Sequence, residues 1–341
     1  MRPVAGSASC ARSKGRDPVP RWVLDACVDT APFGDLDRWA HPPTSGTIAD
    51  GWLHGRGAAD SKVGVAIFCH VAARLADDGD RERMKGSLVV LLDADEHTGR
   101  FGGARAYFDH DNHPRPVGGV MIGYPGFDKL VVGSSGVFRA EMRVHGVAAH
   151  SGSRHASPNA VVKAAALVNL LDGVDLPADG GGDFPMRPQL TVTRIGGGHG
   201  YSIVPDLCVL NLDIRTTPAF DAQAADSLLR TVAADLDRRW AGTPATEILT
   251  DTNWPPYVLD RYQVLRTTLV ETATALGHQV EPKISGPSSI GNYLAGLGVP
   301  ATAGFGVAYK SLHATDERID LTTIPLVEAT YLGTTRCLLG L

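Results

Sequence analysis

Residues 55–76 read GRGAADSKVGVAIFCHVAARLA, and residues 87–97 read SLVVLLDADEH. The first stretch is a glycine-rich turn that leads into an amphipathic segment, Lys62–Ala76, and the second begins as an apolar run of strand length. The same alternation of short apolar runs with amphipathic segments starts at Trp22–Ala26 and continues to Val117–Ile122. This order of strands and helices predicts an α/β fold with a mostly parallel sheet.

A block of different character follows, in which strands with alternating apolar residues are interspersed with two helices. The expected strands are Val137–Val144, Leu190–Ile195 and Cys208–Ile214, and the expected helices are Pro158–Leu171 and Ala222–Trp240. This grouping is typical of a ferredoxin-like α+β domain, and the α/β pattern returns after Pro255-Pro256. We therefore expect residues 136–250 to be inserted into a larger domain made of residues 1–135 and 251–341.

The composition limits the classes of partner. The 32 Lys and Arg residues are outnumbered by 37 Asp and Glu residues, so the chain has no basic field for a nucleic-acid backbone. The longest apolar run, Val63–Ala73, is too short to cross the ~30 Å hydrocarbon layer of a membrane.

The five cysteines form no Cys-x-x-Cys pair, which favours a reducing, cytoplasmic location. We expect the first sixteen residues to be a frayed start, because no apolar segment of a targeting peptide follows their basic residues.

Side chains that carry chemistry stand at the ends of the predicted elements. Asp60 precedes a helix, Glu96 and His97 follow an apolar strand, and His313 lies in a polar segment near the C-terminus. Strand ends in open α/β sheets are where ligands bind. Taken singly, Asp60 also fits a helix N-cap, and the other residues fit a solvated surface. Taken together, the two histidines and Asp60 suit zinc, with Glu96 as a general base.

The order of motifs resembles the co-catalytic zinc amidohydrolases and exopeptidases that include acetylornithine deacetylase, succinyl-diaminopimelate desuccinylase, aminoacylase and the glutamate carboxypeptidases. The similar segments are Cys27–Pro32, Gly55–Lys62, Asp95–Gly99, Ile122–Pro125, Gly146–Gly152, Asp213–Arg215 and the segment around His313. The resemblance implies a catalytic domain with an inserted lid and dimerisation domain, and hence a homodimer. It also implies hydrolysis of an amide bond in a small N-acyl amino acid or dipeptide-like substrate that has a free carboxylate.

Two metal positions are implied by the resemblance, with Asp60 bridging them. The first would use Asp60, His97 and His313. His97 stands where the family has a ligand Glu, but imidazole is a good zinc donor. We expect zinc here, with cobalt or manganese as alternatives, and the resemblance makes Glu96 the base.

The second metal position departs further from the family pattern, because Cys27 replaces a His and Tyr124 replaces an acid. A thiolate binds zinc well, but a phenol with a pKa of about 10 rarely loses its proton. Cys27 therefore fits either a ligand or a small buried thiol. Asp29, which in the family orients the missing His, is expected to have no imidazole to hold.

Further roles follow only from the resemblance. His150 would reach the active site of a neighbouring subunit and donate to the tetrahedral oxyanion, or else be a hairpin-tip residue. Arg215 would hold a substrate carboxylate or form a surface salt bridge, and Asn292 would contact substrate or cap a helix. The Asp60–Ser61 peptide bond is expected to be cis.

The departures at Cys27 and Tyr124 leave a second hypothesis open. The chain would then be a homologue with a degraded second metal site that is non-catalytic or that forms amide bonds. A metal count separates the hydrolase from the non-catalytic homologue.

Overall fold

The computed structural model describes residues 9–14, 20–77, 79–110, 116–182 and 184–341. The chain divides into two compact units. The larger comprises residues 1–133, 258–285 and 289–341, and the smaller comprises residues 134–257 and 286–288. The short piece Gly286–Ser288 was not foreseen from the sequence, because it lies apart in the chain from the rest of the smaller unit.

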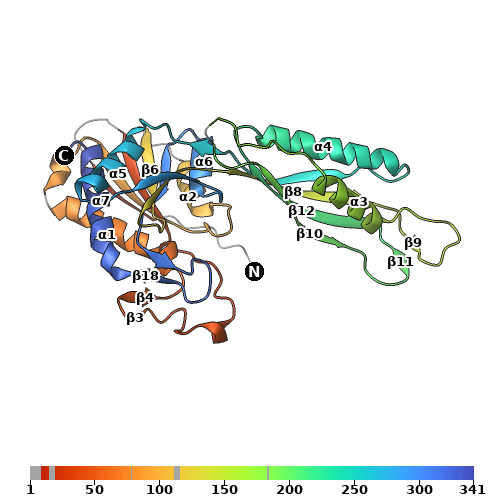
Figure 1. Ribbon diagram of the computed structural model, residues 1–341, viewed down its shortest axis with the longest axis horizontal. Helices are drawn as coiled ribbons and strands as arrows, with labels where there is room; N and C mark the ends of the chain where they lie inside the picture. The colour runs from red at the N-terminus through yellow and green to blue at the C-terminus, as the bar shows by residue number, and fades with distance from the viewer. Residues whose placement is uncertain (1–8, 15–19, 78, 111–115, 183) are drawn as a thin grey trace. The chain divides into compact units, whose positions relative to one another are not determined.

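The larger unit is built on an eight-stranded sheet in the order β1-β5-β2-β6-β16-β7-β14, with β15 paired to β7 (Figure 1). The bounds are β1 Ser9–Lys14, β2 Arg21–Cys27, β5 Ser87–Asp93, β6 Val117–Ile122, β7 Lys129–Ser134, β14 Tyr257–Val258, β15 Glu281–Ser285 and β16 Ala301–Gly304. Strands β5, β2, β6 and β16 are parallel neighbours. Every residue of β2 is buried, as expected where both faces of a parallel sheet are covered.

Strand β1 pairs antiparallel with β5 along all six of its residues. The prediction of a frayed start was therefore wrong for residues 9–14, because the backbone of β5 supplies a ladder of hydrogen-bond partners. Residues 1–8 and 15–16 of that predicted segment lie outside the described residues.

Helices pack against the sheet of the larger unit. They are α1 Val63–Asp77, α2 Gly102–Phe108, α5 Val264–Ala275, α6 Ile290–Gly296 and α7 Ile324–Leu338, with short turns η1 Leu36–Arg38, η2 Ala58–Lys62, η3 Asp80–Glu82 and η4 Leu321–Thr323. Helix α1 buries Ile67, Phe68, Val71 and Leu75, whose spacing places them on one face. Phe68 meets Tyr331 of α7 edge to face, with ring centroids 4.9 Å apart.

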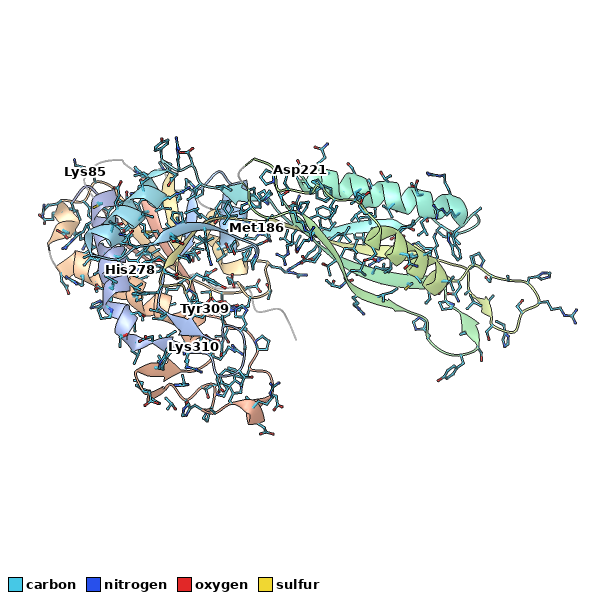
Figure 2. The ribbon with its side chains drawn as sticks, viewed as in Figure 1. Lys85, Met186, Asp221, His278, Tyr309 and Lys310 are labelled. Carbon is cyan, nitrogen blue, oxygen red and sulfur yellow. The ribbon has the colours of Figure 1, made fainter. Side chains whose placement is uncertain are left out.

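A second sheet of the larger unit joins segments that are far apart in the sequence. It contains β3 Thr47–Ala49, β4 Trp52–His54, β17 Tyr309–Lys310 and β18 Arg318–Asp320 in the order β17-β18-β4-β3. Tyr309 and Lys310 are labelled in Figure 2. Because β4 pairs with β18, the turn that begins at Gly55 lies beside the segment that carries His313. These short strands were not predicted.

The smaller unit has the chain order β8, α3, β10, β12, α4, β13, and its four main strands form an antiparallel sheet in the order β10-β12-β8-β13 (Figure 1). The bounds are β8 Gly136–His145, α3 Ala160–Asp172, β10 Gln189–Gly197, β12 Leu207–Thr216, α4 Ala222–Arg239 and β13 Glu247–Trp254, with a minor pair of β9 Ala149–His150 and β11 Ile203–Val204. Its core contains Met142, Leu167 and Leu229 from the sheet and both helices. The predicted fold class, a mostly parallel α/β sheet with an inserted ferredoxin-like unit, is confirmed. No helix in the described part of the chain is long and apolar enough to cross a membrane.

Candidate metal centre

The carboxyl ends of β2, β5 and β6 lie at one edge of the parallel part of the sheet. Cys27 is the last residue of β2 and pairs in register with Asp93, the last residue of β5. Glu96 follows β5, and Tyr124 follows β6 by two residues. In open α/β folds this edge is the place for a ligand, and the candidate residues gather there.

Three side chains from distant parts of the chain converge near this edge. The ligand atoms of Asp60, His97 and His313 all lie within 4.8 Å of one another. His313 Nε2 is 2.7 Å from Asp60 Oδ2, and His97 Nε2 is 3.7 Å from the same oxygen. The Asp60 carboxylate is buried, whereas 48% of the His313 side chain is exposed. One carboxylate and two imidazoles that are open to solvent on one side match the protein ligands of a catalytic zinc site.

Asp29 holds the imidazole of His97. Its Oδ2 lies 3.2 Å from His97 Nδ1 and accepts the backbone N–H of the same residue at 3.1 Å. Nδ1 therefore faces a carboxylate, while the buried Nε2 has no hydrogen-bond partner among the described residues and is free to ligate a cation. Burial opposes protonation, but the bond to Asp29 and the charges of Asp60 and Glu96 outweigh it and raise the pKa of His97. The same negative charges favour a bound cation.

The expectation that Asp29 has no imidazole to hold was wrong. Asp29 follows the end of β2 by two residues, and β2 is the parallel neighbour of β5, after which His97 lies. The imidazole thus comes to Asp29 from the adjacent strand, although position 27 carries a thiol.

A buried ion pair connects the segments that carry Asp60 and His313. Arg56 Nη1 donates to Glu317 Oε2 at 2.6 Å, and both side chains are almost completely buried. Glu317 Oε1 accepts the backbone N–H of Ala59 at 2.9 Å and of Asp60 at 3.4 Å, while Arg56 Nη2 donates to the carbonyl of His313 at 3.3 Å. The sequence showed both residues inside the similar segments, but nothing in their spacing assigned them to each other.

Glu96 stands beside the three candidate ligands. Its Oε2 is 3.7 Å from His97 Nδ1. Burial raises the pKa of Glu96 to about 7, and the charge of Asp60 adds to the effect. A carboxyl group with a pKa near neutral is suited to accept a proton and then to return it.

Cys27 and Tyr124 provide weaker donors. The Sγ of Cys27 lies 3.4 Å from the hydroxyl of Ser61, and burial, with Asp60 and Glu96, raises the pKa of its thiol. The same causes raise the pKa of the Tyr124 phenol. In the absence of an ion, neither side chain offers an anionic ligand at neutral pH.

The backbone around the centre has unusual conformations. The Asp60–Ser61 peptide bond is cis, as predicted. Asp95 and His313 adopt left-handed conformations, with φ of 70° and 56°, which are uncommon outside glycine and concentrate at functional sites.

The remaining predicted site residues are Asn292 in the larger unit and Arg215 and His150 in the smaller unit. Asn292 is fully buried and closes a capping box at the start of α6, where its Oδ1 accepts the Ser289 N–H at 2.8 Å; this contact agrees with the N-cap alternative, and the substrate contact stays a prediction. In the smaller unit, Arg215 pairs with Asp213 at 2.8 Å. His150 is exposed in β9, and its Nδ1 accepts the Gly152 N–H at 3.0 Å.

Comparisons with known proteins agree with this geometry. A model of peptidase family M20/M25/M40 matches residues 24–336. The protein belongs to this family. The succinyl-diaminopimelate desuccinylase of Cereibacter sphaeroides is 30% identical over 319 residues, which cover 89% of this chain and 80% of that protein. The enzyme of the same description from Marinobacter nauticus is 28% identical over 310 residues, which cover 87% and 78%.

Two solved structures share the fold of this M20/M25/M40 family member. An M20 family metallo-carboxypeptidase from Sulfolobus solfataricus has a TM-score of 0.75 at 17% identity and covers 96% of this chain and 87% of its own. A dinuclear metal binding peptidase of the M20 family from Bacillus subtilis has a TM-score of 0.72 at 17% identity, with 98% and 85% covered. Together with the family match, these relatives make the protein a metal-dependent enzyme that hydrolyses amide bonds.

Proposed function

We propose that the protein hydrolyses the amide bond of a small N-acyl amino acid or dipeptide-like substrate with one zinc ion, held by Asp60, His97 and His313. The observation that carries this proposal is the convergence of their ligand atoms within 4.8 Å. Two features of His97 add to it: its Nε2 has no hydrogen-bond partner in the part of the chain that the structure describes, and its Nδ1 is held by Asp29. Zinc in such a site polarises a carbonyl and acidifies water.

Glu96 is the general base in this proposal. It removes a proton from the attacking water and returns it to the leaving amine, so that its own charge is restored at the end of the cycle. Its partial burial and its place beside the candidate ligands support this role. The non-catalytic alternative is disfavoured by the same cluster, because a base and three donors meet at one edge of the sheet.

A free carboxylate on the substrate is supported by a pocket in the smaller unit. This pocket has a volume of about 520 Å³, and Met186 (labelled in Figure 2), Arg187, Gln189 and Arg215 line it. Asp213, which pairs with Arg215, also pairs with Arg139 at 3.0 Å. The guanidinium groups therefore outnumber the carboxylate, and an arginine fork suits a carboxylate.

We also propose a homodimer formed through the smaller unit, in which His150 serves the partner's active site. Strand β10 is an edge strand, with β12 as its neighbour within the described sheet. Val162, Ile195 and Ile203 expose about half of their surface, and Tyr201 is fully exposed. Unpaired strand edges and exposed apolar side chains favour association.

We further propose a cytoplasmic, reducing location, which fits the described cysteines, since Cys27, Cys69, Cys208 and Cys337 are free.

The substitution Glu96→Gln tests the proposed chemistry. The amide cannot take a proton from water, so we expect kcat to fall by about 10²- to 10⁴-fold while bound zinc remains at the wild-type level. Zinc content and the hydrolysis of a panel of N-acyl amino acids measure the two effects. Glu271→Gln, at an exposed position on α5, is the control. Unchanged turnover in Glu96→Gln would remove Glu96 from the mechanism.

A further inference from the structure

Two groups of donors occupy the centre. Besides Asp60, His97 and His313, the ligand atoms of Cys27, Glu96 and His97 also lie within 4.8 Å of one another. The second group contains neither Asp60 nor His313, and it contains the proposed base. It shares His97 with the first group, but its other two donors differ, so a cation held there would have a different set of ligands.

We propose that Cys27, Glu96 and His97 form an inhibitory site for thiophilic divalent cations, such as Cd²⁺ or excess Zn²⁺. The inhibitory part rests on the proposed function, because it depends on Glu96 as the base. The cation-binding part stands on the donors alone.

The chemical types of the three donors determine which cations the site prefers. A thiolate, an imidazole and a carboxylate suit zinc and softer ions, whereas Mg²⁺ and Ca²⁺ prefer oxygen ligands. Only 3% of the Cys27 surface is exposed, and its thiol faces Ser61 at 3.4 Å. Glu96 and His97 are the members of the group that are partly open to solvent, with side chains 19% and 10% exposed.

The charge around the thiol favours the exchange of its proton for a cation. The Cys27 side chain is buried near the acidic residues Asp60, Glu96 and Asp93, an environment in which a bare thiolate is unfavourable. Acidic side chains attract a divalent ion, which binds the sulfur as the thiol proton leaves to solvent. The negative charge of the Cys27 sulfur is thus balanced either by a proton, in the thiol, or by a bound cation, in the metal-bound thiolate.

Occupation of this site opposes catalysis because its donors are shared. An ion that is bound to the Glu96 carboxylate prevents that group from accepting a proton from water. The ion also engages His97, which the proposed zinc site needs. Inhibition is therefore expected in proportion to occupancy.

Cadmium titration of the full-length protein loaded with one equivalent of zinc tests the proposal. In a background where Cys10, Cys69 and Cys337 are replaced by Ser, the remaining cysteines are Cys27 and Cys208, which are both buried. The ultraviolet thiolate-to-cadmium charge-transfer band reports binding without reference to activity. We expect a saturable band whose amplitude follows the fractional loss of hydrolysis.

Cys27→Ser in this background should remove the saturable band and raise the half-inhibiting cadmium concentration by about tenfold or more, normalised to the variant's own uninhibited rate. Cys208→Ser, the matched buried cysteine of the smaller unit, should change neither. Glu96→Gln retains the thiol and should raise the cadmium concentration for half of the band amplitude; this variant keeps the test open if Cys27→Ser fails to fold.

A band that survives Cys27→Ser, or a band midpoint unchanged by Glu96→Gln, would overturn the site. A wild-type protein that shows the band but no hydrolysis would instead overturn the proposed function and leave the cation site standing.

Discussion

The metal centre has two ends, one formed by Asp60, His97 and His313 and the other by Cys27, and they differ in the residues that hold each donor in place. At one end, Asp29 fixes His97, and the Arg56–Glu317 pair binds the backbone beside Asp60 and His313. At the other end, Cys27 shares one hydrogen bond with the hydroxyl of Ser61. A cluster of suitable side chains is thus preorganised as a metal site only where neighbouring residues set the orientation of each donor.

The comparison is tested most strongly by removing one donor from each end. His97→Ala should weaken zinc binding by about 1,000-fold or more, since a site worth roughly 10 to 16 kcal/mol loses one of its protein ligands. Cys27→Ala should keep zinc affinity within about tenfold of the wild type. Competition with a chelator measures both constants. Equal losses in the two variants would show that the two ends are equivalent.

Glu317→Gln tests the contribution of the buried Arg56–Glu317 ion pair. It leaves the Arg56 guanidinium buried without its counter-charge, and breaking such a pair costs about 3 kcal/mol or more in the free energy of unfolding. Asp226→Asn breaks an exposed pair with Arg230 and should have a far smaller effect. Urea denaturation of both variants provides the measurement. A Glu317→Gln protein as stable as Asp226→Asn would contradict the role given to the buried pair.

The smallest expected effect concerns the buried carboxyl groups near Cys27. Burial raises the pKa of Asp93 to about 7, and the charge of Glu96 adds to it. The unfolded chain releases this proton near pH 3.9, whereas the folded chain keeps it until about pH 7. Raising the pH between these values therefore favours the unfolded state, by at most about 1.4 kcal/mol per pH unit.

Asp93→Asn should remove this contribution of Asp93 to the pH dependence of the free energy of unfolding. The free energy of unfolding of metal-free protein should then fall less from pH 5 to pH 7 than in the wild type, by about 1 kcal/mol per pH unit. Asp37→Asn, an exposed carboxyl in η1, serves as the control. Parallel pH profiles for wild type and Asp93→Asn would show that Asp93 ionises normally in the folded chain.

Much of the fold could be predicted because the long elements carry clear periodicity. Strand β6 was predicted with its observed bounds, Val117–Ile122, and α4 differs from the predicted helix by one residue at its end. The strands β3, β4, β17 and β18 were missed, because two- and three-residue strands have no periodic pattern. The pairing of β4 with β18, which joins the two short hairpins into one sheet, connects segments more than 250 residues apart.

The donors of the centre could be named from the sequence, but their supports could not. Asp60, His97 and His313 stand in recognisable motifs, and the structure brings them together. The Asp29–His97 contact joins two adjacent strand ends, and the Arg56–Glu317 pair joins residues 261 positions apart. Such pairings follow from the register of the sheet and from burial, which no local pattern contains.

The number of zinc ions that remain on the wild-type protein after dialysis distinguishes a single metal site from a dinuclear one. Because one end of the centre is preorganised and the other is not, we predict one tightly held ion per chain. No retained ion, or two ions retained with similar affinity, would contradict this account of the centre.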